Sequence, residues 1–231
     1  MTKTVGLIGG FSWQSTSVYY KEINEHVNAR QGGLHSANLL IRSIDYAELA
    51  AMVSQKDYNG MTRMLCKHGQ ELKDANAQAL VLCANIAHKA AESLEQSSGL
   101  PVLHIVDFTA QKINTFGFKK VGLLATRAVM EEDFYKARLQ GFGLEIAIPS
   151  EEFRSTADND IFVEMSKGTI PQDVRSRWHE AYRLLFHEQG VDCVILACTE
   201  LRLVFVPVDL SGPTFETTTI HAGGIAEWAL A

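Results

Sequence analysis

The sequence has no long apolar run and no basic cluster. Its apolar runs are far shorter than the roughly 20 residues that a membrane-spanning helix requires. The chain starts Met1-Thr2-Lys3-Thr4-Val5, which lacks the hydrophobic core of a signal peptide. A net charge of −6 argues against nucleic acid or an anionic membrane as a partner. We therefore expect a cytoplasmic protein with no nucleic-acid and no membrane partner.

Cysteine is scarce, and its spacing excludes the usual metal sites. The 231 residues include four cysteines, with no Cys-x-x-Cys pair and no zinc-like spacing. They are Cys66, Cys83, Cys193 and Cys198. His68 and His88 do not complete a metal set with them, so we expect reduced thiols and no metal. The 46% apolar and 21% charged residues are typical of a globular protein large enough for two small domains.

One stretch near the end of the chain is a candidate active site. Five apolar residues between Asp192 and Cys198 predict a buried parallel strand, and Thr199 is the expected cap of a following helix. Ligands of open α/β sheets bind beyond the carboxyl ends of the strands, and a helix N-terminus there would favour a thiolate. The alternative is that Cys198 simply fills the core, as free cysteines often do.

A second copy of this stretch supports the functional alternative. Shifting the sequence by 114 residues superimposes 80–85 on 194–199, and a shift of 116 superimposes 3–10 on 119–126. The pattern predicts an internal duplication with one strand-end site in each half. Ala84 is then the counterpart of Cys198. Cys83 lies one residue earlier, so its side chain should point to the other face of the strand.

Strands alternate with helices along the whole chain, which predicts an α/β protein with two pseudosymmetric domains, each a small parallel sheet flanked by helices. We expect domain one to comprise 1–106, completed by 213–231, and domain two to comprise 107–212, with a cleft between them holding both strand-end sites. The expected strands are 5–8, 37–44, 80–83, 100–106, 121–125, 144–148 and 192–196, with a further extended stretch at 213–215. The expected helices begin in the loop at 9–16 and continue at 58–72, 85–98, 107–116, 131–139, 161–167, 174–187 and 220–230.

Four polar residues in the first half are candidates for either a functional or a structural role. The loop that contains Ser12 could bind an anion, or its glycines could only allow a tight turn; it matches no nucleotide motif. Arg42 could bind a substrate carboxylate or be a solvated surface residue. Asn85 could cap a helix and also contact a ligand. His88 is expected to be a structural histidine.

Several ordered motifs together resemble the aspartate/glutamate racemase family. They are Gly9–Thr16, Gly32–Ala37, Leu82–His88, Leu123–Arg127, Glu132–Tyr135 and Leu196–Leu201. The resemblance implies a cofactor-independent amino-acid racemase that forms a homodimer and acts on a small amino-acid or carboxylate substrate. It also implies one acid/base residue from each half, at the positions of Ala84 and Cys198. The substrate-binding residues that it implies are Ser12, Arg42, Asn85, Thr126, Lys167, Thr199 and Glu200.

The sequence departs from the family pattern at four positions. In Cys-Asn-Thr-x-His the cysteine is replaced by Ala84 and the threonine by Ile86; Val129 replaces a hydroxyl residue and Glu216 an aspartate. These changes leave three hypotheses: a racemase in which water, Cys83 or another group supplies the second base, a one-thiol enzyme such as a decarboxylase, or a non-catalytic binder of small carboxylates. The retained Cys198 disfavours the binder.

Overall fold

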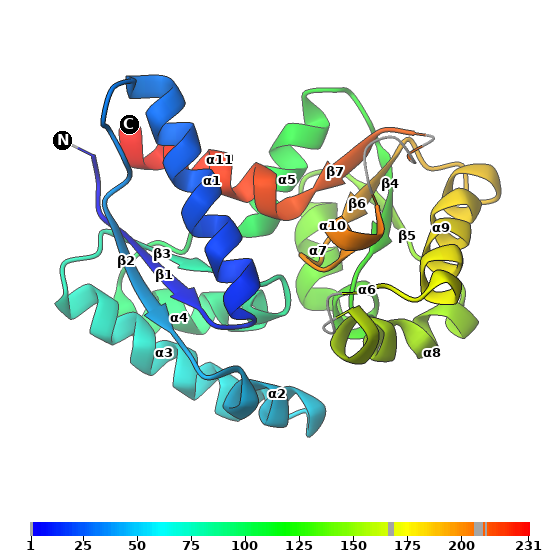
Figure 1. The fold of residues 1–231 in the computed structure, drawn as a ribbon, viewed down its shortest axis with the longest axis horizontal. Helices are drawn as coiled ribbons and strands as arrows, with labels where there is room; N and C mark the ends of the chain where they lie inside the picture. The colour runs from blue at the N-terminus through cyan, green and yellow to red at the C-terminus, as the bar shows by residue number, and fades with distance from the viewer. Residues whose placement is uncertain (1, 166–168, 206–209, 211) are drawn as a thin grey trace. The chain divides into compact units, whose positions relative to one another are not determined.

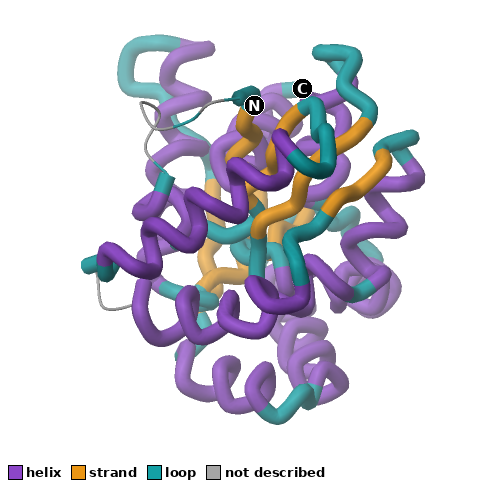
Figure 2. Tube along the Cα trace, turned by 90° about the vertical axis from the view of Figure 1, so that its right-hand side faces the viewer, coloured by secondary structure: helices purple, strands orange, loops and turns teal. Residues whose placement is uncertain are grey.

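The computed structural model describes residues 2–165, 169–205, 210 and 212–231. The chain divides into two compact units, one made of Met1–Ile105 with His221–Ala231 and the other of Val106–Ile220 (Figure 1). Each unit holds one parallel sheet with helices packed on it (Figure 2). The two sheets confirm the predicted α/β class. No helix in these ranges is both long and apolar enough to cross a membrane.

The first sheet has the strand order β2-β1-β3, and all its pairs are parallel. Its strands are β1 (Val5–Gly9), β2 (Leu39–Ser43) and β3 (Ala79–Leu82). The central β1 and the neighbouring β3 are fully buried, whereas β2 is a partly exposed edge strand. The apolar runs therefore located the strands of this sheet to within about two residues.

Helices of the first unit pack on this sheet through the apolar faces expected from the sequence. Helix α1 (Trp13–Gln31) buries Tyr19, Ile23 and Val27, and α3 (Tyr58–Asp74) buries His68 together with its apolar stripe. The other helices of this unit are α2 (Tyr46–Ser54), the 3-10 helix η1 (Ile86–Ala90), α4 (Ala91–Ser98) and the part of α11 (Thr217–Leu230) from His221 onward.

Two predictions for this unit were wrong in detail. The segment 85–98 is a 3-10 helix followed by α4 rather than one helix, and the Asn85 side chain caps none of the described η1 N–H groups. The segment 100–106 forms only an isolated bridge between Leu80 and Val102, because Pro101 has no N–H to donate to a ladder. Helix α5 (Ile105–Asn114) starts immediately afterwards.

The second sheet has the order β5-β4-β6-β7 and is also parallel. Its strands are β4 (Lys120–Leu124), β5 (Glu145–Ala147), β6 (Cys193–Leu196) and β7 (Thr214–Glu216). The sequence predicts that the segment from residue 213 onward completes the first domain, and the structure corrects this. Because β7 pairs with β6, that segment stays in the second unit until Ile220.

Three further predictions, all about the helices of the second unit, differ from the structure. The segment 131–139 divides at the extended Glu132 into α6 (Arg127–Glu131) and α7 (Asp133–Gly141). The segment 161–167 is in part the π-helix η2 (Asp160–Glu164); residues 166 and 167 lie outside the described residues. Thr199 is not a helix cap, because α10 (Leu201–Val204) follows Glu200. The remaining helices are α8 (Glu151–Asn159), which the sequence analysis missed, and α9 (Gln172–His187).

Candidate active site

Cys198 lies two residues beyond the end of β6, at the carboxyl edge of the second sheet. The Ala197 N–H donates to the Leu124 carbonyl at 2.8 Å, so the strand pairing continues almost to the thiol. The Cys198 residue is partly exposed, and its Sγ–H donates to Glu200 Oε2 at 2.9 Å. The Thr199 hydroxyl donates to the same carboxylate oxygen at 2.9 Å. One carboxylate thus holds two consecutive side chains at the strand end.

The surroundings of Cys198 favour the neutral thiol. Burial raises the pKa of Cys198 well above its ordinary value, and the negative charge of Glu200 raises it further. The expected stabilisation of a thiolate by a helix N-terminus was wrong, because α10 has only four residues and begins with a carboxylate at its cap. The resting thiol therefore carries its proton, and Glu200 is placed to accept it.

Two buried threonine hydroxyls lie just beyond the ends of β4 and β7, the two strands that pair with β6. Thr126 follows β4 and is 7% exposed, and Thr218 follows β7 and is fully buried. Neither Oγ1 atom has a hydrogen-bond partner among the described residues. An unsatisfied buried hydroxyl costs about 1–3 kcal/mol, so these two atoms are candidate contacts for a bound ligand. Thr126 was expected from the sequence; Thr218 was missed, although it belongs to a run of three threonines.

A second carboxylate belongs to the same region. The charge of Asp158 contributes to the raised pKa of Cys198, and its Oδ1 accepts the backbone N–H of Arg127 at 2.8 Å. Asp158 therefore caps the start of α6 and adds negative charge near the thiol. Nothing in the sequence distinguished this residue from other acidic residues on helices.

In the first unit, the strand register places Ala84 at the position that matches Cys198. Leu82 pairs with Ile8 in the first sheet, as Leu196 pairs with Leu124 in the second, and Ala84 and Cys198 each lie two residues further on. The Cys83 N–H donates to the Ile8 carbonyl at 3.0 Å, which repeats the Ala197 bond of the other unit. The duplication inferred from the sequence is thus repeated in the hydrogen bonding.

Cys83 differs from Cys198 in its environment. Its side chain is completely buried, and burial raises its pKa far above the ordinary value. The matching position in the second unit is Ala197, also buried. Cys83 therefore occupies a core position, as the alternation of side chains along a strand predicted.

Ser12 and His88 have structural contacts in the first unit. Ser12 caps α1 by accepting the Ser15 N–H at 3.1 Å. His88 Nδ1 donates to the Ala84 carbonyl at 2.9 Å, and its Nε2 accepts the Ile105 N–H at 3.2 Å, which fixes its tautomer. His88 thus holds the backbone of the position that matches Cys198. Asn85, next to it, is 6% exposed.

Arg42 does not lie at the end of β3 or β1 but on the edge strand β2. Its Nε donates to Glu71 at 3.0 Å and its Nη1 to the Ser43 carbonyl at 2.9 Å. The Lys167 prediction lies outside the described residues. Within the described ranges, no group of three histidine, cysteine, aspartate or glutamate side chains is arranged to hold a metal ion.

The fold and the site define a duplicated α/β protein with a thiol–carboxylate pair at the end of one strand and an alanine at the matching strand end. Residues 8–223 match the family model described as Asp/Glu/hydantoin racemase. This match covers most of the chain, so the chain belongs to the Asp/Glu/hydantoin racemase family.

Solved structures and a curated relative agree with this assignment. A putative Asp/Glu racemase from Yersinia pestis is 40% identical and superimposes with a TM-score of 0.92, over 99% of this chain and 100% of its own. An aspartate racemase homologue from Pyrococcus horikoshii OT3 is 28% identical, with a TM-score of 0.83 over the full length of both chains. The broad specificity amino-acid racemase RacX of Bacillus subtilis (strain 168) is 22% identical over 224 residues, 94% of each chain.

Proposed function

We propose that this protein is a cofactor-independent enzyme of the amino-acid racemase type that moves a proton at the Cα of a small amino acid, with Cys198 as its acid/base. The observation that carries the proposal is the Cys198–Glu200 hydrogen bond of 2.9 Å at the end of a parallel strand. A thiol that only filled the core would need neither partial exposure nor a carboxylate acceptor. Family membership supplies the reaction class, and the contacts supply the residue.

The proposed chemistry starts with the thiol proton passing to Glu200. The Cys198 thiolate then takes the Cα proton of the substrate, and negative charge develops on the substrate's carboxylate as the C–H bond breaks. Fixed hydroxyl donors stabilise that charge without reorganising. Thr126 and Thr218, whose hydroxyls have no hydrogen-bond partner in the described part of the chain, are the candidates for this role. Return of the proton from Cys198 regenerates the original enantiomer.

Inversion also needs a proton donor on the opposite face of Cα. The position of the family's first base is occupied by Ala84, whose methyl group carries no exchangeable proton. The neighbouring Cys83 is buried and has a strongly raised pKa, which disfavours it as a substitute. With an alanine at this position, the proposal predicts fast exchange of the Cα proton and slow inversion.

Proton NMR in D₂O with L- and D-amino acids tests this proposal. We expect one enantiomer to lose its Cα proton with retention of configuration, and Ala84→Cys to increase inversion by roughly 10²–10⁴-fold, the usual contribution of one positioned acid/base. Cys198→Ala should abolish exchange, whereas Cys193→Ala, a matched control at the start of β6, should not. Full activity of Cys198→Ala would contradict the assignment.

A second candidate, a one-thiol decarboxylase, follows from the same alanine. After loss of CO₂ the carbanion needs a proton on one face only, and Cys198 alone could deliver it. Disubstituted malonates in the same NMR assay separate the two candidates: CO₂ release with no amino-acid exchange would favour the decarboxylase. Binding of carboxylates without either reaction would favour the non-catalytic alternative.

We also propose that the enzyme is a cytoplasmic homodimer, on the basis of the resemblance to the family. Size-exclusion chromatography with light scattering tests the dimer. A mass near 25.6 kDa would indicate a monomer.

A further inference from the structure

A polar hollow of about 570 Å³ lies in the first unit, between the edge strand β2 and helices α2 and α3. Its lining comprises Arg42, Ile44, Asp45, Glu48, Arg63, Met64, Lys67 and His68. The volume is within the range of small-molecule sites, roughly 300–1,000 Å³. Strand β1 separates β2 from β3 in the sheet, so the hollow's strand lies roughly 10 Å from the strand that leads to Ala84.

One side of the hollow carries preorganised nitrogen groups. The Glu71 carboxylate accepts from both Arg42 Nε, at 3.0 Å, and His68 Nδ1, at 2.9 Å. These two bonds lower the pKa of Glu71, so the carboxylate is charged. They hold the Arg42 guanidinium and the His68 ring in place. Among the described residues Arg42 Nη2 remains as a free donor, whereas Nε2 of the neutral His68 ring is an acceptor. Preorganised donors bind a ligand at a smaller entropic cost than mobile ones.

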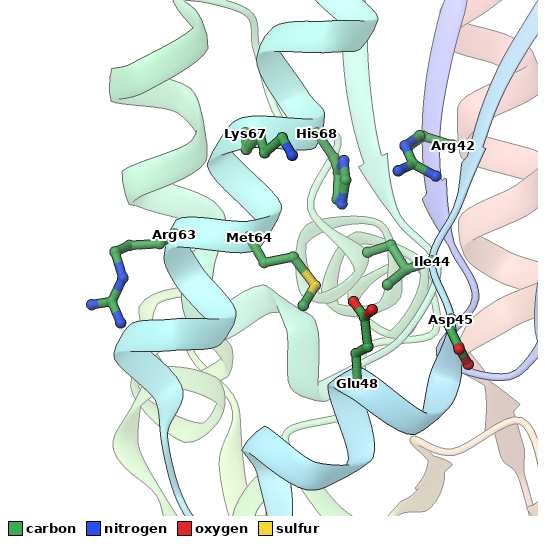
Figure 3. A pocket seen from close by; sticks show the side chains of 8 residues that line it. All are labelled: Arg42, Ile44, Asp45, Glu48, Arg63, Met64, Lys67 and His68. Atoms are coloured by element: carbon green, nitrogen blue, oxygen red, sulfur yellow. The ribbon is translucent and has the colours of Figure 1, made fainter.

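The opposite side carries a negative charge. Figure 3 shows the Glu48 carboxylate turned toward the space that the Arg42 guanidinium and the His68 ring also face. The Lys67 ammonium lies beside His68, whereas the Arg63 guanidinium points away from this space. The exposed side chains of Glu48 and Lys67 have no hydrogen bond and no ion pair among the described residues.

Apolar side chains lie between the two charged sides. Ile44 and the Met64 thioether occupy the space between Glu48 and the nitrogen groups (Figure 3). A ligand that matches this lining has a carboxylate, an ammonium group and an apolar side chain. That combination describes a free amino acid with an aliphatic side chain.

We propose that this hollow is a second amino-acid site, outside the strand-end site of Cys198. The ligand's carboxylate binds Arg42 and Lys67, its ammonium group binds Glu48, and its side chain contacts Met64 and Ile44. Asp45 is not part of the proposed contacts, because its carboxylate caps α2 by accepting the Ala47 N–H at 3.0 Å.

The Met64 methyl group gives a direct signal for occupation of the hollow. The chain has six methionines, so ¹³C-methyl NMR gives a short spectrum in which Met64→Leu identifies the resonance. The probes are L-leucine, 4-methylpentanoate, which lacks the ammonium group, and 3-methylbutylamine, which lacks the carboxylate. We expect L-leucine to shift the Met64 methyl resonance saturably and each analogue to bind about tenfold or more weakly, since each loses a charge-assisted contact.

Variants separate this site from the catalytic one. Arg42→Gln and Glu48→Gln should each weaken L-leucine binding about tenfold, and Glu48→Gln should leave 4-methylpentanoate binding unchanged. Arg63→Gln is the matched control and should have no effect. Cys198→Ala should abolish Cα exchange and leave the Met64 response intact, so failure of either proposal is visible without the other.

Two results would overturn the second site. One is the absence of a saturable Met64 shift with L-leucine. The other is equal binding of L-leucine and 4-methylpentanoate with no effect of Glu48→Gln, which would show a simple anion site. Thermal melts of each variant check that the fold is unchanged.

Discussion

Lowering the pH should destabilise the first unit through His221. This side chain is fully buried on α11. Its Nε2 donates to the Leu103 carbonyl at 2.7 Å, so Nδ1 accepts the Tyr19 hydroxyl at 2.9 Å. Both ring nitrogens are satisfied only in the neutral form. Burial, with a smaller contribution from the nearby His88, lowers the pKa of His221 to about 3.

The sign and size of the effect follow from proton linkage. In the unfolded chain the histidine pKa is about 6.5, so below that pH the unfolded state binds a proton that the folded state does not. Stability is therefore complete above pH 6.5 and falls as the pH decreases toward 3. At pH 5 the difference is about 1.5 pH units, or about 2 kcal/mol. Domains are stable by about 5–15 kcal/mol, so this loss is measurable.

Urea unfolding followed by circular dichroism at pH 7.5 and at pH 5 measures this loss in the free energy of unfolding. His221→Asn removes the titrating group, and the wild type should lose about 2 kcal/mol more than this variant between the two pH values. His35→Asn makes the same exchange at an exposed position and should keep the wild-type dependence. Equal pH dependence in the wild type and His221→Asn would refute the reasoning.

Three further predictions concern the strand ends. Gly10→Ala should destabilise the protein by about 2 kcal/mol or more in urea unfolding, because Gly10 has a φ of 91° and a Cβ there would meet the backbone after β2. Glu200→Gln should lower the pKa of Cys198, so alkylation of this thiol by iodoacetamide, followed by peptide mass spectrometry, should begin at a lower pH; an unchanged profile would contradict the role of Glu200. Ala84→Cys combined with Ile86→Glu should invert amino acids faster than Ala84→Cys alone in the D₂O assay, and equal rates would show that no adjacent carboxylate is needed.

Much of the fold could be predicted because each strand is a short buried apolar run. The β1–β3 and β4–β6 pairs lie where the runs placed them, and the repeat of about 115 residues located Ala84 opposite Cys198 in the alignment of the halves. Local breaks were harder to predict. Pro101 reduced a predicted strand to one bridge, and the extended Glu132 divided a predicted helix. Both depend on one residue's backbone rather than on periodicity.

The site was predictable in its position but not in its electrostatics. Sequence identifies Cys198, Thr199 and Glu200 as neighbours, yet it does not show that one oxygen of Glu200 accepts from both preceding side chains. That arrangement reverses the expected effect on the thiol, because a carboxylate raises the pKa that a helix N-terminus would lower. The position of the Thr218 hydroxyl, which has no partner within the described residues, likewise depends on how β7 leads into α11.

The asymmetry between the two strand ends extends beyond the missing thiol. Leu82 in the first unit and Leu196 in the second occupy equivalent strand positions. Four residues further along the chain, the first unit has Ile86 and the second has Glu200. The first unit therefore lacks both the thiol and the carboxylate that would accept its proton. A cysteine introduced at Ala84 would have no neighbour equivalent to Glu200, so it would exchange its proton only with solvent or substrate. Ala84→Cys alone should therefore increase inversion, and adding Ile86→Glu should increase it further, because the new thiol would then have a carboxylate placed to accept its proton as Glu200 is placed beside Cys198.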